Sequence, residues 1–247
     1  MASPLFHELT LDPARGEGVG LSPGATLATG LPELDRLLKG GLPRGKLVEV
    51  TGGLSSGKTS LISSILRGAS AAGECLAYVD AFDTLDPESF GKAGVDPAAL
   101  LWVRCRAAGL GLEAAAERAL KAADILVQAG GFAVVVLDLD PVEYRHSSRI
   151  LRIPAHIWFR FQRAVKGSPT ILLVLSGQKL TGTAAAVVLA LERRQVHWGA
   201  PCAAYRFEDR TPPMPGGRKG TRFQGVESQA RLLKGEFHGC ISVHSRF

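Results

Sequence analysis

The chain has 247 residues, of which 46% are hydrophobic and 21% are charged, a composition typical of a soluble globular protein with a sizeable core. No apolar run reaches the roughly 18 uncharged residues of a membrane-spanning helix. The first residues lack the basic start and apolar stretch of a signal peptide. Four cysteines are scattered without the spacing of metal ligands. We therefore expect a cytoplasmic protein with reduced thiols and no membrane partner.

The net charge of +6 is unevenly distributed along the chain. Residues 1–140 carry 12 Lys/Arg and 17 Asp/Glu, whereas residues 141–247 carry 17 Lys/Arg and only 6 Asp/Glu. A basic second half suggests a polyanion or an acidic protein as partner. The alternative is a basic face that is simply solvated.

Strands and helices are expected to alternate from residue 46 to residue 175, after an arm over residues 1–25 and a short helix over Leu31–Leu38. Such alternation predicts an α/β fold with a mostly parallel, twisted sheet flanked by helices. The expected strands are Lys46–Val50, Cys75–Asp80, Leu100–Val103, Phe132–Asp138 and Thr170–Leu175; the expected helical segments are Ser60–Leu66, Pro87–Lys92, Leu112–Gln128 and Ile157–Lys166.

The pattern changes after Leu175. Ala184–Arg194 and Ala203–Phe207 are expected to be strands in antiparallel hairpins, and Gln229–Val243 one or two further strands. We therefore expect a flexible arm over residues 1–25 and one core over residues 26–247, in which residues 202–247 form a basic extension of the sheet.

Residues 52–59 read Gly-Gly-Leu-Ser-Ser-Gly-Lys-Thr and fit the phosphate-binding P-loop, G-x-x-x-x-G-K-[ST]. An expected strand precedes this stretch and an expected helix follows it. Glycines let backbone N–H groups turn toward an anion, and the helix N-terminus adds its positive dipole end. Two alternatives are a plain Gly/Ser turn and a P-loop that no longer serves nucleotide. The candidate nucleotide-binding residues are Gly52, Ser55, Ser56, Gly57, Lys58, Thr59 and Ser60.

Asp138 ends an apolar strand one strand–helix–strand step beyond the P-loop, with Leu100–Val103 as a strand that could lie between. This is the expected position of a Walker B aspartate, which would hold Mg²⁺ together with the Thr59 hydroxyl, directly or through water. Asp140 is a weaker second candidate. The alternative for Asp138 is a carboxylate that caps the next turn.

Several motifs in order resemble the RecA recombinase family: residues 40–50 (GGLPRGKLVEV), Ser55–Thr59, Tyr78–Ala81, Leu85–Pro87 and Gly94–Asp96. The resemblance extends over about residues 28–196. It implies a RecA-like P-loop NTPase core that binds ATP and Mg²⁺ and acts on single-stranded DNA in recombination and the SOS response. It also implies that Asp86 contacts the base and that Gln178 senses the γ-phosphate.

The chain departs from this family at positions that matter for hydrolysis. Phe82 stands where the family has the glutamate that polarises the attacking water, and a phenyl ring cannot accept a proton. Asp83 is a weak substitute, because adjacent side chains at a strand end point in different directions. We therefore expect weak or absent ATP hydrolysis, and expect Phe82→Glu to raise it if the rest of the site is sound. Ser89, with Phe90 beside it, replaces the aromatic residue that stacks on adenine.

The parts that the family uses on DNA and in filaments also differ. Only Lys179-Leu180 separates Gln178 from Thr181, where the family has a long DNA-binding loop, and the filament-forming N-terminal helix is not evident, so no long self-filament is expected. Non-specific, electrostatic contact with DNA or a protein remains an expectation. Its candidate residues are Arg145, Arg149, Arg152, Arg210, Arg218, Lys219 and Arg222.

In architecture and length the chain resembles the ImuA family, RecA-like accessory proteins of bacterial mutagenesis cassettes. That resemblance implies an accessory or regulatory role in translesion synthesis within the SOS response, through RecA, polymerase subunits such as ImuB, or DNA. An active DNA-dependent ATPase or recombinase of the RecA class is the alternative. A third hypothesis is a regulator that binds ATP without turnover.

Overall fold

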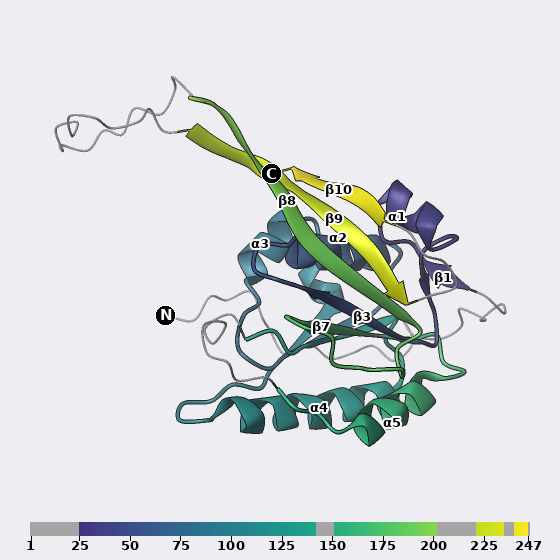
Figure 1. Ribbon diagram of the computed structural model, residues 1–247. Coiled ribbons are helices and arrows are strands. Elements are labelled where there is room, and N and C mark those ends of the chain that lie inside the picture. The colour runs from purple at the N-terminus through teal and green to yellow at the C-terminus, as the bar shows by residue number, and fades with distance from the viewer. Residues whose placement is uncertain (1–24, 142–150, 202–220, 235–239, 247) are drawn as a thin grey trace.

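The computed structural model describes residues 25–141, 151–201, 221–234 and 240–246. Its centre is an eight-stranded sheet with helices on both faces (Figure 1). The strands of this sheet are β3 (Leu47–Gly52), β4 (Leu76–Asp80), β5 (Leu100–Arg104), β6 (Val134–Asp138), β7 (Ile171–Ser176), β8 (Val187–Pro201), β9 (Thr221–Lys234) and β10 (Cys240–Arg246). Two short strands, β1 (Thr26–Leu27) and β2 (Leu42–Pro43), form a separate antiparallel pair.

The helices connect the strands and cover the sheet. They are α1 (Pro32–Leu37), α2 (Lys58–Ala71), α3 (Pro87–Lys92), α4 (Leu112–Ala129) and α5 (Ala155–Val165), with a short 3₁₀ turn over Pro97–Ala99. In Figure 1, α4 and α5 lie on one face of the sheet, and α1, α2 and α3 lie toward the other. Helices on both faces explain why strands such as β6 are buried throughout and apolar up to their last residue.

The strand order is β10-β9-β8-β3-β7-β6-β4-β5. The six strands from β8 to β5 pair in parallel, whereas β9 and β10 are antiparallel additions at one edge. In the middle of the sheet, β7 lies between β3 and β6, with Val50 beside Leu175 and Asp138 beside Leu175 in register. The ends of the P-loop strand and the Asp138 strand therefore meet at one edge of the sheet.

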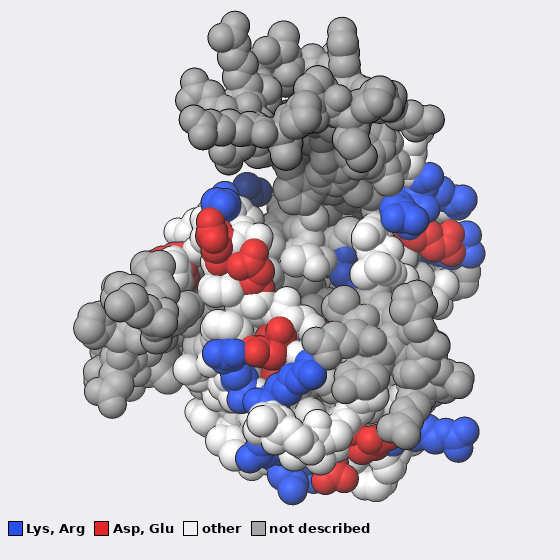
Figure 2. Space-filling model, turned by 90° about the vertical axis from the view of Figure 1, so that its left-hand side faces the viewer, with Lys and Arg blue, Asp and Glu red and all other residues white. Residues whose placement is uncertain are grey.

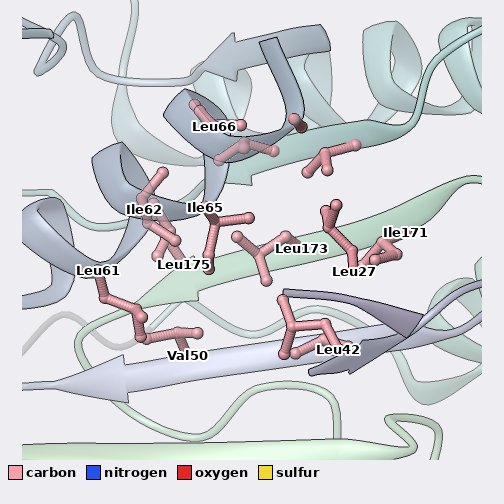
Figure 3. Close-up of a cluster of buried hydrophobic side chains, with 14 of the residues drawn as sticks. Leu27, Leu42, Val50, Leu61, Ile62, Ile65, Leu66, Ile171, Leu173 and Leu175 are labelled. Carbon is pink, nitrogen blue, oxygen red and sulfur yellow. The ribbon is translucent and has the colours of Figure 1, made fainter. Parts of the chain in front are cut away.

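Two apolar layers hold the helices on the sheet. One layer packs α2 against β3 and β7, where Leu61 and Ile65 meet Val50 and Leu173 (Figure 3). The other packs α4 and α5 against the opposite face, with Trp158 and Phe161 fully buried. In α4 and α5 the buried residues recur at helical spacing along one side of the helix. The amphipathic pattern of the sequence therefore determines which side of each helix faces the sheet.

The predicted α/β fold is confirmed, and most predicted elements lie within two residues of the observed ones. The helix after the P-loop is longer than expected and begins at Lys58. Two expectations need correction. β5 does not lie between the P-loop strand and the Asp138 strand, because it pairs with β4 at the outer edge. The segment expected to begin a hairpin strand at Ala184 begins at Val187 and pairs in parallel with β3, besides its antiparallel pairing with β9.

Some predictions fall on residues outside the described part of the chain. These are most of the N-terminal arm, the strand at Ala203–Phe207 and much of the proposed basic extension. Where the extension is described, β9 and β10 continue the main sheet as an antiparallel pair. Within the described residues, no helix combines the length and apolar character needed to cross a bilayer.

Candidate nucleotide-binding site

The P-loop occupies the connection between β3 and α2, so its glycines lie where the strand turns into the helix. Gly57 is the N-cap of α2 with φ of 89°, a left-handed conformation that favours glycine. A Cβ on Gly57 would lie 3.0 Å from the Ser228 hydroxyl of β9. A Cβ on Gly52 would overlap the carbonyl oxygen of Leu191 in β8. The loop can therefore pass under the β8–β9 hairpin only with glycine at these positions.

Lys58 folds back over the P-loop instead of pointing into solvent. Its ammonium group donates to the carbonyl of Gly53 at 2.8 Å and to the carbonyl of Gly52, and it lies 3.4 Å from the Ser56 hydroxyl. It also forms an ion pair with Asp140 at 3.1 Å, in which both side chains are less than one-tenth exposed. A phosphate group that binds in this loop would replace some of these partners as ligands of the ammonium.

Thr59 and Ser60 begin α2 beside Lys58. Thr59 is exposed and Ser60 is partly buried, whereas Ser56 in the loop is buried. Ser55 has a positive φ of 55°, which forms part of the sharp turn. These residues lie together with Gly52, Gly57 and Lys58 at the carboxyl edge of β3, the position at which α/β sheets bind ligands.

Asp138 is buried at the end of β6 and already has three hydrogen-bond donors. Its Oδ2 accepts from the Tyr78 hydroxyl at 2.6 Å and from the Thr84 hydroxyl at 3.0 Å, while its Oδ1 accepts from the Asp140 N–H at 3.0 Å. Burial raises the pKa of Asp138 to about 6, although the hydrogen bond from Tyr78 works in the opposite direction. Burial, followed by the charge of Asp138, raises the pKa of Tyr78 well above its ordinary value.

The donor set is compatible with Mg²⁺ held partly by water. Mg²⁺ in nucleotide sites normally keeps several waters and uses one or two carboxylates plus phosphate oxygens, a role that Asp138 and the Thr59 hydroxyl can fill. Direct coordination by Asp138 would have to compete with its present donors, whereas coordination through water would not. Among the described residues, no group of three or more His, Cys, Asp or Glu side chains could hold a metal ion without such help.

Phe82 lies in the turn after β4, which Asp80 organises. The buried Asp80 carboxylate accepts from the N–H groups of Phe82, Thr84 and Leu85 at 2.9–3.2 Å. The Phe82 ring is only 5% exposed and packs in the apolar layer beneath α4 and α5. A carboxylate at this position would enter the core, so the structure gives no support to the expectation that Phe82→Glu raises turnover.

Asp83 does not point toward the P-loop either. It has a positive φ of 63° and forms two hydrogen bonds with the Arg104 guanidinium, at 2.6 and 2.5 Å. The hydrogen bond from Arg104 lowers the pKa of Asp83. Arg104 also stacks over the Trp102 ring, 4.9 Å from its centroid. Asp83 is therefore part of an ion pair at the β5 edge.

Asp86 caps α3. It accepts from the Glu88 N–H at 3.2 Å and from the Ser89 hydroxyl at 2.5 Å, and the latter bond lowers its pKa. Asp86 and Ser89 are both exposed, so the Asp86 carboxylate is accessible to a ligand. Phe90 points inward and packs edge-on against Tyr78, with ring centroids 5.8 Å apart. Phe90 therefore cannot replace the stacking aromatic in this conformation.

Gln178 is exposed in the turn after β7, between the ends of β3 and β6 in the sheet. Two contacts near this turn were missed or underrated in the sequence. Asp140, and not Asp138, is the carboxylate that pairs with Lys58. Glu49 is a fully buried carboxylate inside β3 that hydrogen-bonds to this turn. A charged residue inside an otherwise apolar strand was the available signal for Glu49.

The candidate contact residues for DNA or a partner are only partly described. Arg152 is exposed, and Arg222 lies in β9. The others lie outside the described residues: Arg145, Arg149, Arg210, Arg218 and Lys219. On the described surface visible in Figure 2, basic and acidic side chains lie next to one another in small groups, without one continuous basic area.

Comparisons with known proteins match the first half of the chain, which includes the P-loop. Residues 23–142 match the RecA N-terminal domain family, a shorter range than the expected 28–196. Protein RecA of Rhodococcus opacus (strain B4) is 41% identical over 124 residues, which make up 50% of this chain and 33% of that protein. Protein RecA of Clavibacter michiganensis subsp. michiganensis is 42% identical over 118 residues, 47% of this chain and 30% of that protein. The chain thus spans about a third of these relatives.

The fold extends beyond the sequence match. The KaiC-like protein PH0186 from Pyrococcus horikoshii OT3 superposes with a TM-score of 0.54 at 15% identity, covering 90% of this chain and 94% of that chain. At this identity the likeness concerns the fold alone. Residues 23–142 are therefore similar to the RecA N-terminal domain family, and the fold as a whole resembles that of a KaiC-like protein.

Proposed function

We propose that this protein binds ATP through its P-loop, hydrolyses it slowly or not at all, and acts through contacts with other components of the bacterial DNA-damage response. This proposal rests on a contrast between the P-loop and the position of the water-activating residue in the same site. The P-loop retains Lys58 and Thr59, whereas the position of the expected water-activating glutamate holds Phe82, which is buried in the core. A site that binds ATP but has no general base would stay occupied by ATP and would hydrolyse it slowly or not at all.

The neighbouring carboxylates do not supply the missing base. Asp83 is paired with Arg104, and Asp80 accepts backbone N–H groups of its own turn. Asp138 accepts hydrogen bonds from the hydroxyls of Tyr78 and Thr84, so its role would be to hold Mg²⁺ through water. Mg²⁺ bound there would neutralise charge between the phosphates, while Lys58 would contribute its positive charge from the P-loop side.

An accessory role in translesion synthesis is the finer part of the proposal. Its support is the resemblance in architecture to the ImuA family and the short connection between Gln178 and Thr181, where recombinases carry a DNA-binding loop. On this view the partners are RecA, translesion polymerase subunits such as ImuB, and DNA bound without sequence preference. Occupancy of the P-loop would then regulate these contacts.

An active DNA-dependent ATPase of the RecA class is the second candidate. The observation that favours it is the arrangement of Lys58, Thr59 and Asp138 at one edge of the sheet, which provides the phosphate and metal ligands of such an enzyme. A water positioned by backbone groups alone would then have to carry the reaction.

Steady-state ATP hydrolysis with and without single-stranded DNA, beside a titration with a fluorescent ATP analogue, separates the two candidates. We expect binding with little hydrolysis. Robust DNA-stimulated hydrolysis that Lys58→Ala abolishes would favour the ATPase. Electron microscopy with ATP and single-stranded DNA tests the accessory role, for which we expect no long regular filaments.

A further inference from the structure

Glu49 is a buried carboxylate in the strand that leads into the P-loop. It lies three residues before Gly52, is 0% exposed and has Val48 and Val50 as neighbours in β3. A charged group in such a place is tolerated only when hydrogen-bond donors surround it, because the cost of removing it from water is high. The identity of its donors therefore indicates what the carboxylate holds in place.

The donors that the structure describes all lie in one short segment, from the last residue of β7, Ser176, to Thr181. Oε1 accepts from the Ser176 hydroxyl at 3.3 Å and from the Leu180 N–H at 2.5 Å. Oε2 accepts from the Thr181 N–H at 3.2 Å and from the Thr181 hydroxyl. Glu49 thus binds both ends of the same turn, the last residue of β7 on one side and Leu180–Thr181 on the other.

The three residues between these ends are exposed. Gly177, Gln178 and Lys179 project at the edge of the sheet where β3, β7 and β6 end. A Cβ on Gly177 would lie 3.3 Å from the Asp140 carboxylate, and Asp140 in turn contacts Lys58. The turn therefore borders the P-loop site, and the strand that supplies the P-loop also supplies the residue that fixes the turn.

We propose that Glu49 is a positioning residue that holds the Gly177–Lys179 turn against the P-loop strand, so that its exposed side chains meet the terminal phosphate of a bound nucleotide. This rests on the proposed nucleotide binding and on the expected contact of Gln178 with the γ-phosphate, and it adds the residue that holds Gln178 in place. Four hydrogen bonds to one carboxylate leave the turn little freedom, so the side chains are placed before the nucleotide arrives.

The test compares Glu49→Gln with the wild type in two measurements. The first is amide hydrogen exchange at Leu180 and Thr181, and the second is the ratio of the dissociation constants for ADP and a non-hydrolysable ATP analogue. Because the Gln amide keeps only one acceptor oxygen, either the Leu180 or the Thr181 N–H loses its acceptor. We expect that amide to exchange about tenfold faster or more, and the ratio to fall to that of the Gln178→Ala/Lys179→Ala double variant. Ser176→Ala removes only the 3.3 Å hydrogen bond and serves as the matched control with a smaller effect.

The outcomes separate the inference from the proposed function. A wild type that binds neither nucleotide overturns the proposed function and the phosphate part of the inference, while the exchange rates still decide whether Glu49 holds the turn. Wild-type discrimination that survives unchanged in a folded Glu49→Gln protein overturns the inference alone. If Glu49→Gln does not fold, Thr181→Val removes only one hydroxyl donor. A reduced ADP-to-ATP ratio in that variant supports the inference, and an unchanged ratio contradicts it.

Discussion

The Lys58 ammonium lies 3.1 Å from the Asp140 carboxylate, and both side chains are almost fully buried at the mouth of the P-loop. An incoming phosphate therefore meets a lysine whose charge is already balanced, beside a carboxylate that repels it. Asp140 is two residues beyond Asp138, the expected metal-binding aspartate. The Asp140 carboxylate contacts Lys58, whereas the Asp138 carboxylate contacts Tyr78 and Thr84.

Asp140→Asn should raise the affinity for nucleotide. The substitution removes the carboxylate that competes with phosphate for Lys58, which we expect to strengthen binding of ADP and ATP by about tenfold in the absence of Mg²⁺. Isothermal titration calorimetry with EDTA measures this directly. Asp138→Asn is the control, because Asp138 hydrogen-bonds to Tyr78 and Thr84. Equal or weaker binding by a folded Asp140→Asn protein would contradict the prediction.

Wild-type hydrolysis of ATP should be close to background, with or without single-stranded DNA. The physical reason is that no carboxylate stands free to activate water in the turn after β4, where Phe82 is buried and Asp83 is paired. A phosphate-release assay with Lys58→Ala as the baseline measures the difference. A wild-type rate far above that baseline would show that another group orients the water.

Phe82→Glu should destabilise the protein without a gain in turnover. The ring is buried among apolar side chains, so a carboxylate there loses its hydration, which we expect to cost about 3 kcal/mol or more. Phe82→Leu keeps an apolar side chain and should cost only about 1 kcal/mol. Denaturant unfolding gives both values. A Phe82→Glu protein as stable as Phe82→Leu and faster in hydrolysis would mean that the turn opens readily.

Asp138→Asn should change how stability depends on pH. The folded pKa of Asp138 is about 6, above its unfolded value of 3.8, so the folded state binds the proton more tightly. The free energy of unfolding therefore decreases as the pH rises through this window, and the penalty above pH 6 amounts to at most about 3 kcal/mol. Without Mg²⁺, Asp138→Asn should be more stable than the wild type at pH 7.5, with a difference that shrinks toward pH 4. A difference independent of pH would refute this.

Neutralising Arg218, Lys219 and Arg222 together should weaken single-stranded DNA binding in a salt-dependent way. If each residue contacts a phosphate, the slope of log affinity against log salt should become shallower by about one per residue removed. Neutralising the exposed Arg118, Lys121 and Lys166 gives a control with the same change in net charge. An unchanged slope and affinity would assign the first group to protein contacts or to solvent.

Much of the fold could be predicted because local signals and global packing agree. Apolar runs such as Val134–Leu137 mark buried parallel strands, and Gly57 before Lys58 marks the turn into a helix. The place of β5 at the outer edge could not be predicted, because sequence order does not state which strands are neighbours. The direction in which the Phe82 ring points could not be predicted either, because it depends on how α4 and α5 pack against the sheet.

Within the site, residue types were easier to predict than their contacts. The motif identifies Lys58, but only the folded chain brings Asp140 to it from the segment after β6, a strand that is not adjacent to β3. Glu49 and Thr181 are 132 residues apart and meet because β7 and β8 both pair with β3. Such long-range hydrogen bonds leave only a weak trace in the sequence, here one acidic residue in an apolar strand.

The strands of the sheet differ in length, so one part of the sheet extends beyond the body and can unfold separately from it. β8 pairs with β3 only from Val187 to Leu191 and beyond that point pairs with β9, while β10 pairs with β9 only between Gly225 and Arg231. The far end, where Trp198–Pro201 faces Thr221–Phe223, is therefore a two-stranded ribbon that leaves the body (Figure 1). A two-stranded ribbon without a second layer contributes little stability of its own. The outer ribbon should open at a far lower free energy than the sheet, and partial unfolding there can leave the P-loop strand intact.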